Sequence, residues 1–160
     1  MFNHILVPLD QRSGAVETMS SIRQWLGGTG ATVCLLAVRR PVREIERRGD
    51  RIVHLDELMR EEYAQCHDYL VRLGSHLAYN GIVVQREVRF GELLTETLAV
   101  ARQHSVQAIV LTGQEQPRRS LFRANWVHQL LASAEVPVLV MPQSVPASPR
   151  TGLRYRSVPV

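Results

Sequence analysis

The stretch that decides the fold is residues 107–141, QAIVLTGQEQPRRSLFRANWVHQLLASAEVPVLVM. It begins with an unbroken apolar run, Ala108–Leu111, which is short and β-branched enough for a buried strand. After a polar loop, four apolar residues recur at the spacing of an amphipathic helix: Val127, Leu130, Leu131 and Ala134. A second apolar run, Val136–Met141, follows. Strand, loop, helix and strand in this order predict the βαβ unit of a parallel sheet.

The loop after Leu111 is the expected position of a ligand site. In open α/β sheets, ligands bind in the crevice outside the carboxyl ends of the strands. This loop holds Gly113 and Gln116, followed by the basic residues Arg118, Arg119 and, near the helix start, Arg123.

The rest of the chain repeats the same pattern. Three further strands are predicted at Asn3–Asp10, Thr32–Val38 and Ile82–Val88. Polar residues alternate with apolar ones in the last of these, which indicates a strand nearer the edge of the sheet. Helices are expected after Ser13, over about His54–Tyr79 and after Glu92, with an irregular, solvated segment at 39–51 that includes a short helix around Arg43–Arg48. The stripe facing inward on the long helix runs from Leu55 to Leu77, with Glu62 at its edge.

Five strands alternating with four helices predict a three-layer, doubly wound α/β sandwich with a five-stranded parallel sheet, of the Rossmann-like or flavodoxin-like kind. The composition changes after Pro142 to a proline- and arginine-containing tail without periodicity. We therefore expect a folded domain over residues 1–142 and a tail at 143–160 outside the core.

Composition limits the class of protein. A chain of 160 residues with 45% hydrophobic and 21% charged residues suits a single soluble domain. Its apolar runs are far shorter than the roughly 18 residues of a membrane span, and its first residues predict a strand instead of a signal peptide. These features predict a cytoplasmic protein that does not contact a membrane.

All 19 basic residues are arginine, so every mechanism that needs a lysine, such as a P-loop or a Schiff base, is excluded. The net charge of +4 permits attraction to anions. With 6% aromatic residues and no nucleic-acid-binding motif, a nucleic acid partner is not expected.

Catalytic and metal-binding patterns are not found in the sequence. The six histidines lack metal-ligand spacing with cysteine or carboxylate, and no Gly-x-Ser-x-Gly nucleophile elbow occurs. Cys34 in a strand and Cys66 in a helix fit buried, reduced thiols. We therefore expect no catalytic residues and no metal, and assign the protein no enzymatic activity.

The chain resembles a universal stress protein over about residues 1–142. Five segments in the right order and spacing carry the resemblance: Ile5–Asp10, Leu36–Val38, Val88–Glu92, Ala108–Gly113 and Val136–Val140. The resemblance implies the doubly wound fold of that family and a role in stress adaptation.

Family members that bind ATP carry Gly-x2-Gly-x9-Gly-Ser/Thr after the fourth strand, where glycines let backbone N–H groups approach the phosphates. The matching positions here are Gly113, Gln116, Trp126 and Val127, so only the first glycine is kept. The resemblance therefore implies a degraded phosphate site. No cofactor is expected, and ATP or another adenine nucleotide is the disfavoured alternative.

The half of the site that faces adenosine is kept. Asp10 and Val38 match positions that contact the adenosine part in the family, and Pro8, Leu9 and Thr112 adjoin the site by family position. Simpler roles stay open: a loop or capping carboxylate for Asp10, a plain strand residue for Val38, and a turn for Gly113.

Arginines also follow the ends of the first, second and fourth strands: Arg12, Arg39, Arg40, Arg43, Arg118, Arg119 and Arg123. If they gather around one crevice, arginine forks could bind phosphate or carboxylate in place of glycine amides, with Arg118, Arg119 and Arg123 as the anion contacts. A solvated arginine-rich rim is the other interpretation.

The last strand is the expected partner surface. A bare apolar edge strand invites pairing with another chain, and universal stress proteins commonly dimerise through it. We expect a homodimer through Val136, Val138, Leu139 and Val140, the alternative being an edge covered by the tail. The leading hypothesis is a non-catalytic universal stress protein that binds ATP poorly. The alternatives are a nucleotide- or anion-sensing protein and a weak ATP hydrolase.

Overall fold

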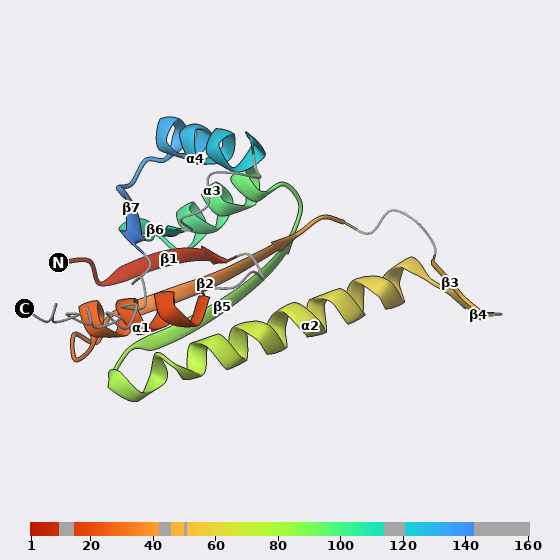
Figure 1. The fold of residues 1–160 in the computed structure, drawn as a ribbon, viewed down its shortest axis with the longest axis horizontal. Coiled ribbons are helices and arrows are strands. Elements are labelled where there is room, and N and C mark those ends of the chain that lie inside the picture. Colours follow the sequence, from red (N-terminus) through yellow and green to blue (C-terminus); the bar gives the residue numbers. More distant parts are fainter. Residues whose placement is uncertain (10–14, 42–45, 50, 114–120, 143–160) are drawn as a thin grey trace, which may run out of the picture.

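The structure, a computed structural model, describes residues 1–9, 15–41, 46–49, 51–113 and 121–142 (Figure 1). Its centre is a five-stranded sheet in the order β5-β2-β1-β6-β7, in which all neighbours are parallel. The strands are β1 (His4–Leu9), β2 (Thr32–Arg39), β5 (Val83–Phe90), β6 (Ala108–Gly113) and β7 (Val138–Pro142). The predicted α/β fold with a five-stranded parallel sheet is confirmed.

Four helices cover the two faces of this sheet. Figure 1 shows α1 (Ala15–Leu26) and α2 (Leu55–Ser75) on one side and α3 (Leu93–Gln103) and α4 (Leu121–Ser133) on the other. In the part of the chain that the structure describes, no helix is both long and apolar enough to cross a membrane.

The three inner strands, β2, β1 and β6, are buried on both faces because their side chains alternate between two cores. In β1, Ile5, Val7 and Leu9 pack against the α1/α2 side, whereas Leu6 packs against the α3/α4 side. The sheet order places β5 at one edge and β7 at the other. Both edge positions agree with the sequence analysis.

The segment after β2 differs from the prediction. Residues 46–48, expected in a short helix, form β3 (Glu46–Arg48), which pairs antiparallel with β4 (Arg51–Val53). Gly49 has a φ of 65°, a conformation that favours glycine, and it supplies the tight turn that a hairpin needs. The helix prediction was wrong because a three-residue strand leaves almost no periodic signal.

The long helix also ends earlier than predicted. After Ser75 the chain forms the short 3-10 helix η1 (Ala78–Asn80) and then turns at Gly81, whose φ is 71°. Two residues placed on inward stripes are exposed, Leu55 at 42% and Leu131 at 53%. Leu55 opens α2 where that helix and the hairpin project beyond the strands (Figure 1), so there is no sheet for it to cover.

Candidate functional site

The candidate site lies at the end of the sheet where β1, β2 and β6 have their carboxyl ends. The strands are parallel, so their carboxyl ends meet at one edge; Leu9 of β1 lies in register with Ala37 of β2. The strand order reverses at β1, because the chain moves outward to β2 and β5 and then returns to β6 on the other side. Such a switch point is where open α/β sheets bind ligands.

Three residues proposed from the sequence come together on one face. Val38, Trp126 and Val127 are half-buried and pack against the same apolar cluster between the sheet and the helices α3 and α4. Leu36 and Leu130 belong to the buried part of that cluster. The kept residue and the two degraded positions therefore contribute to one packed unit.

Leu9 and Pro8 lie at the end of β1 and are both buried. The Leu9 side chain packs in the opposite core, against α1 and α2, and is only 6% exposed. The side chain of Leu9 is therefore not available to a ligand on the α3/α4 face. Pro8 lies in register beside Leu36 of β2.

The remaining proposed residues are placed only in part. Asp10, Gln116, Arg118 and Arg119 lie outside the described residues. Thr112 and Gly113 end β6, in register with Met141 and Pro142 of β7, and Arg123 lies in the first turn of α4. For these three residues the structure gives the backbone position.

The backbone of α4 bears directly on the degraded motif. The helix begins at Leu121, so Trp126 and Val127 lie in its second turn. Only the first N–H groups of a helix lack intrahelical partners; later ones bond to the carbonyl four residues earlier. The amides of Trp126 and Val127 are therefore used within the helix, and the free amides belong to its first turn.

Arg39 does not join the crevice. Its Nε atom lies 3.1 Å from the Cys66 Sγ atom and 3.9 Å from a Glu62 carboxylate oxygen, both on α2. The expectation that Arg39 gathers with the other arginines was wrong, because neighbours in a strand point to opposite faces and Val38 takes the α3/α4 face. On the α2 side, burial raises the pKa of Tyr69, against the opposing effect of the Arg39 and Arg72 charges.

Both cysteines are buried and form no disulfide, as predicted. Burial, reinforced by the charge of Glu87, raises the pKa of the Cys34 thiol to about 12. A thiol with so high a pKa is not a nucleophile near neutral pH. Within the described ranges, no group of three or more histidine, cysteine or acidic side chains is arranged to hold a metal ion.

A polar network on β5 was missed by the sequence analysis. The Glu87 carboxylate lies 2.8 Å from the His104 Nε2 atom and 3.3 Å from the Arg89 Nε atom, and Arg89 also donates to Gln103. His4 contacts Gln85 at 3.2 Å. The sequence did contain a signal for this network, because polar residues recur at every second position of the strand, at 85, 87 and 89. This network ties the end of α3 to the edge strand.

The chain is similar in fold to solved universal stress proteins. UspA from Lactobacillus plantarum is 21% identical, with a TM-score of 0.63 over 87% of this chain and 97% of that one. A universal stress protein in complex with cAMP is 13% identical (TM-score 0.66; 89% and 99% covered). The universal stress protein from Archaeoglobus fulgidus in complex with dAMP is 14% identical (TM-score 0.56; 85% and 94% covered).

The sequence itself gives the family. No curated protein sequence matches the chain significantly. The model of the universal stress protein family, however, matches residues 1–142, which is most of the chain. The chain therefore belongs to the universal stress protein family.

Proposed function

We propose that this universal stress protein works without catalysis and binds ATP poorly, acting in stress adaptation through a partner or another ligand. The observation that carries the proposal is the packing of Trp126 and Val127, which stand at the positions of the last glycine and hydroxyl of the ATP motif. Both side chains pack against the core cluster under α3 and α4.

Two features of these positions oppose phosphate binding: the side chain of Trp126 occupies space, and Val127 lacks a hydrogen-bond donor. A phosphate approaches backbone N–H groups closely only where no side chain intervenes, which is the use of glycine in such loops. A tryptophan carries one of the largest apolar surfaces, and moving it away from the cluster would expose that surface to water. Val127 also lacks the hydroxyl donor of serine or threonine, and both amides lie in the second turn of α4.

A second candidate function is the sensing of a nucleotide or another anion. Val38, at the adenosine-facing position, is half-buried on the same face as Trp126. Two structures of similar fold are complexes with nucleotides that carry a single phosphate, dAMP and cAMP. In this proposal Asp10 and Val38 hold the nucleoside, and Arg118, Arg119 and Arg123 hold the anion in place of the lost glycines.

Calorimetric titration of the full chain with ATP, AMP and cAMP tests both candidates. We expect no saturation by ATP below about 1 mM. Saturable ATP binding near about 1 μM, weakened by Asp10→Ala, would overturn the leading proposal. Release of phosphate from ATP faster than in buffer would favour the third candidate, a weak ATP hydrolase.

For the sensor, the variant is Arg118→Ala/Arg119→Ala. Its matched control is Arg150→Ala/Arg154→Ala, which removes the same charge from the C-terminal tail. The sensor requires the first pair, and not the second, to weaken binding of AMP or cAMP. If the two double variants weaken nucleotide binding equally, Arg118 and Arg119 contribute only a general electrostatic attraction and do not form a specific anion site.

The assembly and the compartment are also proposals. We propose that two copies pair through β7, which is the last strand of the sheet and exposes 59% of Val140. We place the protein in the cytoplasm, because two buried cysteines that form no disulfide suit a reducing compartment.

A further inference from the structure

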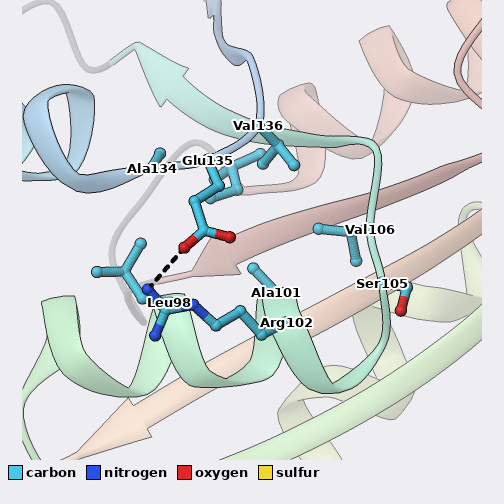
Figure 2. Close-up of a pocket in the computed structure, with 9 residues that line it drawn as sticks. Leu98, Ala101, Arg102, Ser105, Val106, Ala134, Glu135 and Val136 are labelled. Atoms are coloured by element: carbon cyan, nitrogen blue, oxygen red, sulfur yellow. Dashed lines mark hydrogen bonds and ion pairs between the residues drawn. The ribbon is translucent and has the colours of Figure 1, made fainter.

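A pocket of about 260 Å³ lies at the amino ends of β6 and β7, opposite the candidate site at the carboxyl ends of the strands. It is bounded by the end of α3, by the start of β6 and by the segment that joins α4 to β7 (Figure 2). These are the amino ends of β6 and β7, so the pocket shares no lining residue with the candidate site described above.

Six of the nine residues that line the pocket are apolar, and Arg102, Ser105 and Glu135 are charged or polar. Ile109 and Val106 form part of its lining and are 0% and 4% exposed, and Leu98, Ala134 and Val136 add further hydrocarbon. An engineered apolar cavity of about 150 Å³ holds a benzene molecule, so the larger volume here suits an aliphatic or aromatic side chain. Burial of such a group is favourable by about 25 cal/mol per Å².

Two opposite charges stand together in the lining of this apolar pocket. The Arg102 Nη2 atom lies 3.2 Å from the Glu135 Oε1 atom, and Figure 2 shows the carboxylate turned toward the guanidinium. Both side chains are largely exposed, at 62% and 72%. An exposed ion pair contributes at most about 1 kcal/mol, so a ligand can replace it at little cost.

The pair of charges restricts the chemistry of the ligand. An apolar carboxylate would be attracted by Arg102 but repelled by Glu135. An apolar amine, which is positively charged, would be attracted by Glu135 but repelled by Arg102. A zwitterion with adjacent carboxylate and ammonium groups satisfies both residues, because the guanidinium fork binds a carboxylate and the carboxylate binds an ammonium.

We propose that this pocket binds a free α-amino acid with an apolar side chain of about the size of leucine or phenylalanine. The side chain enters the pocket beside Leu98, Ala134 and Val136, which are half-buried. The α-carboxylate binds Arg102 and the α-ammonium binds Glu135. The site is independent of the nucleotide crevice, so its occupation does not depend on whether the chain binds ATP.

The experiment is a titration of the full chain with L-leucine, followed by calorimetry and by amide chemical shifts. The comparison ligands are 4-methylpentanoate, which lacks the ammonium, and 3-methylbutylamine, which lacks the carboxylate. We expect saturable leucine binding with a Kd at or below about 1 mM and at least about tenfold weaker binding of each comparison ligand. Leucine binding no tighter than that of either comparison ligand would overturn the proposal, as would the absence of saturation.

Variants locate the binding. Arg102→Gln and Glu135→Gln are each expected to weaken leucine binding by about tenfold or more. The matched control is Arg60→Gln, which breaks another exposed ion pair, Arg60 with Asp56 at 3.5 Å on α2, and is expected to leave leucine binding unchanged. Equal effects of Arg102→Gln and Arg60→Gln would place the ligand elsewhere and overturn the proposal.

Discussion

Thr97 on α3 carries a buried hydroxyl that has no hydrogen-bond partner among the residues that the structure describes. The residue is 0% exposed, and no described donor or acceptor lies within bonding distance of its Oγ1 atom. Buried hydroxyls in proteins are nearly always bonded, and leaving one unsatisfied costs about 1–3 kcal/mol. Valine has almost the same shape as threonine but lacks the hydroxyl.

We therefore expect Thr97→Val to raise the free energy of unfolding by about 1 kcal/mol, measured by urea denaturation. The matched control is Thr95→Val on the same helix, where the Oγ1 atom donates to Glu92 at 3.0 Å on the surface. Both changes replace threonine by valine on the same helix, but Thr95→Val removes a hydrogen bond and Thr97→Val removes an unpaired buried hydroxyl, so only Thr97→Val is expected to stabilise the protein. A stability gain for Thr95→Val equal to that for Thr97→Val would contradict the expectation.

At the scale of elements, α2 offers a direct test of which face is buried. Leu70 is fully buried against α1 and the sheet, whereas Leu55, on the same predicted stripe, is 42% exposed. We expect Leu70→Ala to lower the free energy of unfolding by about 2–5 kcal/mol, the cost of a cavity in a packed core.

The control is Leu55→Ala, expected to cost about 0.5 kcal/mol or less in the same denaturation experiment. The chemical change is identical, so only burial distinguishes the two variants. A similar loss in the free energy of unfolding for the two variants would mean that Leu55 is buried in solution.

The periodicity of apolar residues predicted the strands and helices that bury apolar side chains in the core, and it missed the short hairpin. The strands β1 and β2 and the four helices were predicted because each buries an apolar run or stripe. The hairpin β3–β4 was not, because Glu46–Arg48 contains no apolar residue and therefore gives no hydrophobic pattern. Leu55 was misplaced because the period of a helix does not reveal where the neighbouring sheet ends.

The site followed the same logic. Topology predicted a ligand site at the carboxyl ends of the strands, and the resemblance to the family selected Val38, Trp126 and Val127, which pack against one cluster in the structure. Strand alternation, applied strictly, would also have separated Arg39 from Val38. The pocket beside Arg102 and Glu135 could not be predicted from the sequence, because these two side chains are 33 positions apart and come together only in the folded chain.

At the scale of the whole molecule, the sheet has two edges of different chemistry. The edge strand β5 carries polar or charged side chains at four of its eight positions, 85, 86, 87 and 89. The other edge, β7, reads VLVMP and carries no charge. Charged side chains on an edge oppose pairing with another chain, whereas a bare apolar edge invites it.

We therefore expect the chain to dimerise through β7 and not through β5. An isologous contact across a two-fold axis pairs each β7 with its copy and covers both bare edges at once. In light scattering, the wild-type chain should have about twice the mass of one 18.1 kDa chain.

Two matched substitutions decide which edge is used. Val140 on β7 and Val83 on β5 are nearly equally exposed, at 59% and 56%. Val140→Glu places two like charges across the proposed contact, and we expect it to return the mass to that of one chain. Val83→Glu adds the same charge to the other edge and should leave the dimer intact. A single-chain mass for the folded wild-type protein, or dissociation by Val83→Glu alone, would exclude β7 as the contact.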